Sequence, residues 1–251
     1  MLSRLRLFTG RASYYLAKRI CDELRAYGEL QHLELGEPYV AKFANDNLKV
    51  KILQSVRGAD VYVVQSAVPE HLSGYGMNPR VKDEEGIESL GLHDSLMELL
   101  IIVDALKSAS AGRITVVCPY FPYVRSDKKD EPRISITARL MAELFQKAGA
   151  DRFLTINLHA LQIQGFFPAP CDQLDSNPLI AQYFKKAFNC DNIGVLATDA
   201  GGVKIATVYA EQLGLPLAVC DKRRVRDKAD PIIRNVIGIN EVRDREIAIF
   251  D

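Results

Sequence analysis

The sequence predicts an α/β protein with two domains, each built on a parallel sheet flanked by helices. Short apolar runs typical of strands alternate along the chain with segments of helical periodicity. This alternation favours parallel sheets, because each crossover between parallel strands usually contains a helix. Strands that are buried on both faces read as continuous apolar runs, as Val61–Val64 does. The 251 residues are enough for two domains with substantial cores.

The individual elements follow from these two patterns, taken in chain order. Apolar runs predict strands at Arg6–Phe8, Val61–Gln65, Ile114–Pro119, Phe153–Leu158, Ile193–Ala197, Pro216–Cys220 and Glu246–Phe250. Helical periodicity predicts helices at Ser13–Leu24, Ser95–Ser108, Ser135–Lys147, Pro178–Phe188 and Val203–Leu213. Asn177 directly precedes Pro178, so we expect it to be the N-cap of a helix with proline in its first turn.

A boundary between the two domains is expected near Cys171–Asn177, because Pro168 and Pro170 interrupt the pattern just before it. A strand–loop–helix block lies on each side of this stretch. We therefore place the first domain at residues 1–172 and the second at residues 173–251. The segment Pro69–Gly91 carries several glycines and charges between a strand and a helix, which predicts a long exposed loop.

Composition argues against several classes of protein. The 32 basic side chains balance the 32 acidic ones, which argues against a dedicated binder of nucleic acid or of a membrane surface. The five cysteines lack metal-site spacing and fit a reducing cytoplasm. Cys118 and Cys220 lie in apolar runs, so we expect them in the core. The sequence shows no signal peptide and no apolar run long enough to span a membrane.

The segment Phe153–Phe167 carries the most informative residue, because an apolar strand there ends beside His159. In open parallel sheets, ligands bind outside the carboxyl ends of the strands. A neutral imidazole at that position can bind a metal or contact a phosphate. The alternative is a histidine whose side chain is satisfied within an ordinary loop.

A second group of polar residues follows the strand that ends at Pro119. Aromatic residues come first, and then Arg125, Asp127 and Lys128. Cations beside aromatic rings suit a nucleotide, because the rings pack against a base while arginine binds phosphate with two hydrogen bonds. The alternative is a solvated run of charges on the surface.

A third group follows the strand Ile193–Ala197, where Asp199 precedes the pair Gly201 and Gly202. Glycines at a strand-to-helix turn let the backbone approach a ligand closely. The amino terminus of the helix that follows favours anions. An ordinary turn between a strand and a helix is the alternative.

Together and in this order, these segments resemble the ribose-phosphate diphosphokinases, also called phosphoribosyl pyrophosphate synthetases. The resemblance runs along nearly the whole chain and also takes in Leu7–Ser13, Phe43–Val50, Asp60–Ser66, Leu96–Leu100, Asp104–Lys107 and Asp221–Arg224. It implies two domains of the type I phosphoribosyltransferase fold. It further implies transfer of the diphosphoryl group of ATP to the anomeric hydroxyl of ribose 5-phosphate, with Mg²⁺ as cofactor. Members of the family form homo-oligomers, often hexamers.

The resemblance also assigns roles to individual residues. ATP binding is implied for Phe43, Arg125, Asp127, Lys128 and His159, of which Phe43 would stack on the adenine of a neighbouring subunit. Ribose-phosphate binding is implied for Asp199, Gly201, Gly202 and Asp251, and metal binding for His159, Asp199, Asn157 and Asp172. Lys222 and Arg224 are implied to be the catalytic cations. An ordinary core phenylalanine remains the alternative for Phe43, and a solvated basic turn for Asp221–Arg226.

The sequence departs from the family pattern at several positions. The departures are Asn157, Pro168, Asn45 and Asn47 in place of acids, and Ser126 in place of a common glutamine. The amide oxygen of Asn157 can still ligate a metal or orient His159. It brings no charge, however, so we expect a lower metal affinity than a carboxylate would give.

The last strand pattern stops at Asp251, which resembles the first of two adjacent acids in the family. In the family, a Thr/Gly-rich loop follows these acids and holds the 5-phosphate of ribose through backbone N–H groups. We therefore expect the sequence to be a fragment of a longer protein, inactive alone, whose coding sequence continues past Asp251.

Two other functions stay open from the sequence. A non-catalytic regulatory subunit of a synthetase complex is favoured by the lost acids, but Lys222 and Arg224 oppose it, because such a subunit has little use for catalytic cations. A phosphoribosyltransferase that consumes the product is less favoured, because Arg125–Lys129 and His159 belong to the synthetase pattern.

Overall fold

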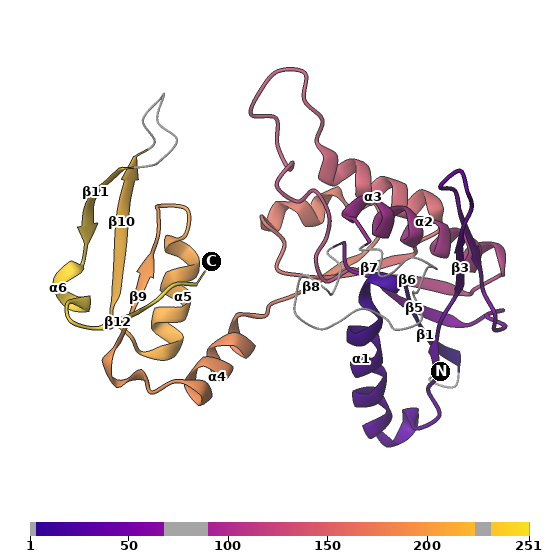
Figure 1. The fold of residues 1–251 in the computed structure, drawn as a ribbon, viewed down its shortest axis with the longest axis horizontal. Helices are drawn as coiled ribbons and strands as arrows, with labels where there is room; N and C mark the ends of the chain where they lie inside the picture. Colours follow the sequence, from indigo (N-terminus) through magenta and orange to yellow (C-terminus); the bar gives the residue numbers. More distant parts are fainter. Residues whose placement is uncertain (1–3, 68–89, 224–231, 251) are drawn as a thin grey trace. The chain divides into compact units, whose positions relative to one another are not determined.

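The computed structural model describes residues 4–67, 90–223 and 232–250, and confirms the α/β architecture with parallel sheets flanked by helices (Figure 1). The chain divides into two compact units, Met1–Leu174 and Asp175–Asp251. Most of the loop expected at Pro69–Gly91 lies outside the described residues, as do Arg224 and Asp251.

The first unit is built on a parallel sheet with the strand order β2-β1-β5-β6-β7-β8. The strands are β1 (Leu5–Thr9), β2 (Leu35–Gly36), β5 (Asp60–Val64), β6 (Arg113–Val117), β7 (Arg152–Ile156) and β8 (Cys171–Leu174). The expected strands are found within one or two residues. The edge strands β2 and β8 were not expected, because neither carries a long apolar run.

Helices cover both faces of this sheet. They are α1 (Tyr14–Ala26), α2 (Leu92–Ser108) and α3 (Thr137–Ala148). Leu7 packs in a cluster with α1, whereas its neighbour Phe8 packs in the cluster that contains α2 and α3. Successive side chains of a strand point to opposite faces, so α1 lies on one side of the sheet and the other two helices on the other (Figure 1).

An aromatic cluster holds the loops that follow β6 and β7 against the core. The ring centroid of Phe167 lies 4.8 Å from that of Phe121 and 4.8 Å from that of Phe153. Phe145 of α3 lies 6.5 Å from Phe153. Phe121 follows β6 and Phe167 ends the 3₁₀ segment Leu161–Phe166 after β7. Both loops are therefore fixed to the same core.

The second unit has a smaller sheet with the order β11-β10-β9-β12. Its elements are α4 (Asn177–Ala187), β9 (Ile193–Ala197), α5 (Val203–Leu213), β10 (Leu217–Arg223), β11 (Ile232–Ile237), α6 (Ile239–Val242) and β12 (Glu246–Ala248). β9, β10 and β12 are parallel, and β11 is antiparallel to β10. β9 and α5 have the bounds that the sequence predicts.

The expected N-cap at Asn177 is wrong by one position. Ser176 is the N-cap of α4 and Asn177 is its first residue. The Oδ1 of Asn177 accepts a hydrogen bond of 3.0 Å from the hydroxyl of Tyr209. The Oδ1 of Asp175 accepts the backbone N–H of Asn177 at 2.9 Å. The side chain of Asn177 thus ties α4 to α5, while Asp175 satisfies the start of the helix.

Cys118 and Cys220 are buried, which confirms that they are core residues. Burial raises the pKa of the Cys118 thiol to about 12, so it stays protonated at neutral pH. Among the described residues, no helix has both the length and the apolar character needed to cross a membrane.

We expect Phe153→Ala to lower the free energy of unfolding by about 3–5 kcal/mol, because it empties the centre of the aromatic cluster. Phe43→Ala is the matched control, because this phenylalanine is exposed and its loss should change stability by about 0.5 kcal/mol or less. Denaturant unfolding of both variants measures the difference. Equal losses in the two variants would contradict the packing described.

Candidate functional site

The segment after β6 and the loop after β7 meet at the carboxyl edge of the first sheet. The side chain of Asp127 is buried, and its Oδ2 accepts a hydrogen bond of 3.4 Å from Gln162 Nε2. Gln162 lies on the 3₁₀ segment directly after His159. The structure therefore brings two of the predicted segments together. Arg125, Lys128 and His159 are exposed beside this contact.

A turn with left-handed backbone conformation at Tyr123 directly precedes the basic residues Arg125 and Lys128. Tyr123 has φ 57°, which is uncommon for an aromatic residue and costs backbone strain. Its carbonyl accepts the N–H of Ser126 at 2.9 Å, and the carbonyl of Ser126 accepts the N–H of Ala138 at α3. The ring of Tyr123 lies 6.2 Å from that of His93 at the start of α2. Helices α2 and α3 thus both hold the turn before Asp127.

Asn157 follows β7 in left-handed conformation, with φ 42°. Its backbone N–H donates to the carbonyl of Leu174 at 3.1 Å. Asparagine and aspartate tolerate this conformation better than other residues with a side chain. An amide in place of the carboxylate common in the family therefore preserves the backbone geometry while it removes the charge.

Asp172, which the resemblance implies as a metal ligand, lies in a different setting. It pairs with Leu154 in the β7–β8 ladder, whereas His159 lies beyond the carboxyl end of β7. Arg152 donates to its Oδ2 from Nε at 2.7 Å, and Arg152 Nη2 lies 2.6 Å from the same oxygen. The placement gives Asp172 an ion pair within the edge strand.

Metal-binding side chains do not gather densely in either unit. Across residues 4–67, 90–223 and 232–250, no group of three or more His, Cys, Asp or Glu side chains could hold a metal ion. Mg²⁺ needs few protein ligands, because it keeps several waters and binds substrate phosphates. Asp199, His159 and Asn157 thus remain chemically suitable donors in their separate segments.

A hydrogen bond to the side chain of Asp199 closes the turn that follows β9 in the second unit. Its Oδ1 accepts the backbone N–H of Gly202 at 3.0 Å, directly before α5 begins at Val203. A Cβ atom at Gly201 would lie 3.2 Å from the same oxygen, so a side chain there would crowd the turn. The lack of a side chain at Gly201 therefore favours the compact turn that Asp199 holds at the amino terminus of α5.

Lys222 lies in β10, next to an irregularity in its pairing with β11. The register of the two strands shifts between Asp221 and Lys222. Such bulges bend a strand and redirect side chains, and they occur often near active sites. Arg224 and Asp251, the other residues implied here, lie outside the described residues.

Phe43 lies at the end of a hairpin that the sequence did not predict. The hairpin joins β3 (Tyr39–Lys42) to β4 (Leu48–Lys51), and Phe43 N–H donates to the carbonyl of Asn47 at 2.8 Å. The phenylalanine is 53% exposed. The alternative of an ordinary core residue is therefore wrong, and the ring is accessible.

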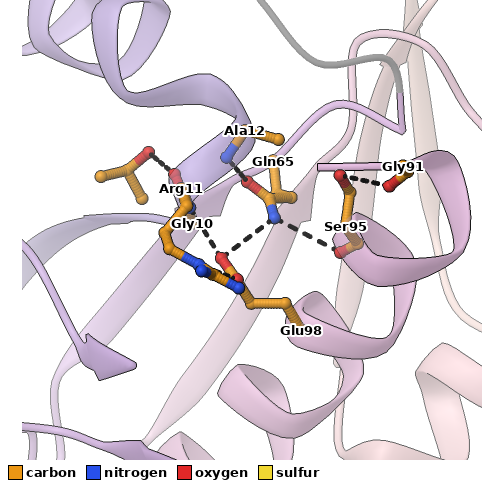
Figure 2. A network of polar contacts seen from close by, with 8 residues as sticks. Gly10, Arg11, Ala12, Gln65, Gly91, Ser95 and Glu98 are labelled. Atoms are coloured by element: carbon orange, nitrogen blue, oxygen red, sulfur yellow. Dashed lines mark hydrogen bonds and ion pairs between the residues drawn. The ribbon is translucent and has the colours of Figure 1, made fainter. Parts of the chain in front are cut away.

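Sequence reasoning missed a buried polar network at the carboxyl ends of β1 and β5 (Figure 2). Glu98 of α2 accepts hydrogen bonds from the backbone N–H and the Nε of Arg11, at 2.7 and 2.5 Å. Gln65 accepts the N–H of Ala12 at 3.1 Å and donates to the carbonyl of Ser95 at 3.3 Å. The signal was an acidic residue, Glu98, on the mainly apolar buried face of α2.

This network occupies a turn that often binds phosphate in α/β proteins. The N–H groups that begin the helix after the first strand commonly point at an anion. Here the N–H groups of Arg11 and Ala12 already donate to Glu98 and Gln65. A bound anion at this turn would have to displace a buried carboxylate.

Comparison with known proteins identifies the family of the chain. Residues 5–149 match the family model of the N-terminal domain of ribose phosphate pyrophosphokinase. A ribose-phosphate pyrophosphokinase of Deinococcus radiodurans is 43% identical over 99% of this chain and 68% of its own length. A ribose-phosphate pyrophosphokinase of Porphyromonas gingivalis is 39% identical over 98% of this chain and 68% of its own length.

A solved structure is similar over the same extent. The crystal structure of phosphoribosylpyrophosphate synthetase from Mycobacterium smegmatis has a TM-score of 0.78 and 34% sequence identity, and the match covers 99% of this chain and 71% of that one. Sequence and fold therefore agree over nearly every residue of the chain. The chain belongs to the ribose-phosphate pyrophosphokinase family of enzymes.

Proposed function

We propose that the full-length protein transfers the diphosphoryl group of ATP to the anomeric hydroxyl of ribose 5-phosphate, which gives phosphoribosyl pyrophosphate for nucleotide synthesis. The contact between Asp127 and Gln162 carries this proposal. It holds the basic segment that ends at Lys128 beside the loop of His159, at the edge of the sheet where α/β proteins bind ligands.

Arg125 and Lys128 bind the phosphates of ATP in this proposal. Both are exposed at the carboxyl edge of the sheet, where a nucleotide can reach them. The guanidinium group of Arg125 can form two parallel hydrogen bonds to a phosphate, and Lys128 adds a point charge. Asp127 is buried, and its hydrogen bond with Gln162 fixes this ATP-binding segment. Transfer of a phosphoryl group depends mainly on such positioning and charge neutralisation.

The donor set fits Mg²⁺ with few protein ligands. In this proposal Asp199 supplies a carboxylate on the ribose side, and His159 and Asn157 lie on the ATP side. When bound, Mg²⁺ neutralises phosphate charge. The resemblance adds Asp172, whose Oδ2 also pairs with Arg152. Asn157 supplies a neutral oxygen, so the protein should need more Mg²⁺ than a relative with a carboxylate there.

The second substrate is assigned to the turn after β9 and to the basic residues beyond β10. Gly201 and Gly202 allow close approach of a sugar phosphate, and the resemblance adds Asp251 to this side. Lys222 and Arg224 are the catalytic cations, which would stabilise the charge that develops on the transferring group. The support for Lys222 is its place beside the bulge in β10.

Phe43 supports a homo-oligomer in this proposal, with a hexamer as in the family. An accessible ring at the end of a hairpin can reach the adenine of a neighbouring subunit. The free cysteines of the chain are compatible with a cytoplasmic location for such an assembly.

Arg125→Ala is expected to weaken ATP binding by about 10–100-fold, because it removes hydrogen bonds to a charged phosphate. Arg139→Ala is the matched control. Arg139 is also an exposed arginine of the first unit, and it pairs with Glu143 on α3 at 3.5 Å. Titration calorimetry with ATP and Mg²⁺ measures both variants. If Arg125→Ala and the control bind ATP with equal affinity, Arg125 is not part of the ATP site.

Asp199→Asn separates the structural role of Asp199, which is to accept the N–H of Gly202, from its proposed role as a Mg²⁺ ligand. The amide oxygen can still accept the N–H of Gly202, so we expect stability within about 0.5 kcal/mol of the native protein. The Mg²⁺ concentration for half-maximal activity should rise, because the charge is lost. Asp199→Ala should also lose about 1 kcal/mol of stability. An unchanged Mg²⁺ requirement in Asp199→Asn would leave the residue with a purely structural role.

Lys222→Ala should lower the rate of phosphoribosyl pyrophosphate formation by about 10³-fold or more, because a cation at the transferring group is lost. ATP affinity should stay unchanged. Lys185→Ala, which removes an exposed lysine of α4, is the control. The assay uses the full-length protein with ATP, ribose 5-phosphate and Mg²⁺.

Two results would overturn the proposed reaction. A folded, full-length protein that binds ATP but forms no product would favour a regulatory subunit of a synthetase complex. Release of pyrophosphate that depends on a nucleobase would indicate a phosphoribosyltransferase.

A further inference from the structure

Three buried or half-buried side chains, Arg11, Gln65 and Glu98, join the β1–α1 turn, the end of β5 and helix α2 (Figure 2). We call them the Glu98 clamp. Glu98 has no exposed surface, although it is a carboxylate, and Gln65 is almost fully buried. None of the three belongs to the residues that the proposed reaction uses, so their burial needs another explanation.

The contacts of Glu98 define one geometry. Oε1 accepts the backbone N–H of Arg11 at 2.7 Å and lies 3.3 Å from Gln65 Nε2, while Oε2 accepts Arg11 Nε at 2.5 Å. A buried carboxylate is costly unless charge and hydrogen bonds compensate it. Backbone and side chain of the same arginine meet both oxygens here. Any shift of α2 along the turn would therefore break several bonds at once.

The clamp reaches the ATP-binding segment first through the end of β5. The backbone N–H of Gln65 donates to the carbonyl of Val117 at 3.0 Å. Two residues later, the N–H of Ala67 donates to the carbonyl of Tyr120 at 3.3 Å. The residue whose side chain belongs to the clamp thus also fixes the chain where it leaves β6.

A second route runs through helix α2. Glu98 and His93 lie on this helix, and the ring of His93 lies 6.2 Å from that of Tyr123. Tyr123 holds the strained turn that ends at Ser126, directly before Asp127. A strained residue keeps its conformation only when its surroundings enforce it. The position of α2, which the clamp sets, is one of those surroundings.

From these two routes we infer that Glu98, Arg11 and Gln65 are positioning residues for the segment Tyr120–Lys128. They touch no substrate. They hold the segment so that Arg125 and Lys128 present their charges in one fixed arrangement, which reduces the ordering that ATP binding would otherwise require. The assignment of ATP to this segment rests on the proposed function, whereas the mechanical link does not.

The test uses two clamp variants and one control. Glu98→Gln keeps an oxygen for the N–H of Arg11 but loses the acceptor for Arg11 Nε, and it leaves only a partly exposed cation unpaired. The double variant R11M/E98Q removes that cation as well. Asp60→Asn is the control, because Asp60 pairs with Arg113 at the opposite end of β5.

Amide hydrogen exchange across residues 120–128 is the first readout, because it reports local opening without any ligand. We expect the exchange rate in this segment to rise about tenfold in both clamp variants, while the exchange rates in β9 and α5 of the second unit stay at their native values. The second readout is the dissociation constant for ATP, which should rise about tenfold. Asp60→Asn should change neither quantity.

The outcomes separate this inference from the proposed function. If the clamp variants fold and residues 120–128 exchange at the native rate, the inference is overturned. Global unfolding of both variants would also overturn it, because the clamp would then have a role in folding alone. A native protein that binds no ATP would overturn the ATP assignment, yet the exchange data would still decide whether the clamp positions the segment.

Discussion

The parallel register of β5, β6 and β7 is the constraint on which the first unit depends. Val63 pairs with Val116, and Val116 pairs with Phe153, so the three strands end at the same edge of the sheet. Every loop that follows them must begin there. The aromatic cluster around Phe167 then fixes two of these loops to the core. The contact between Asp127 and Gln162 is therefore a consequence of strand pairing and apolar packing.

Buried polar groups decide which strand ends can receive a ligand. At β1 the helix-starting N–H groups donate to Glu98 and Gln65, so an internal carboxylate takes the place that an anion could occupy. At β9 the side chain of Asp199 accepts only the N–H of Gly202 among the hydrogen bonds found for the described residues. A carboxylate accepts a backbone N–H at both turns, but Glu98 is fully buried and also pairs with Arg11, whereas Asp199 is only half-buried. Of the two carboxylates, the one at β1 is therefore the harder for an anion to displace.

Sequence patterns predicted the elements whose signal is local. β9 and α5 have their predicted bounds, because an apolar run and a helical period identify buried elements directly. The short edge strands and the β3–β4 hairpin were missed, since few of their side chains are buried. The ion pair between Asp172 and Arg152 was also missed, because no local pattern shows that the two residues lie on adjacent strands. Long-range pairs of this kind depend on register, which one sequence does not give.

Asn157 illustrates how one position can serve the fold and the chemistry separately. Its φ of 42° restricts the choice mainly to glycine, asparagine and aspartate. Glycine would satisfy the backbone but lose the oxygen, whereas aspartate would add a charge beside His159. Asparagine keeps both the backbone conformation and a neutral oxygen donor. Asparagine is therefore compatible with the backbone conformation, and in the proposed function its neutral oxygen is a weaker metal ligand than a carboxylate would be.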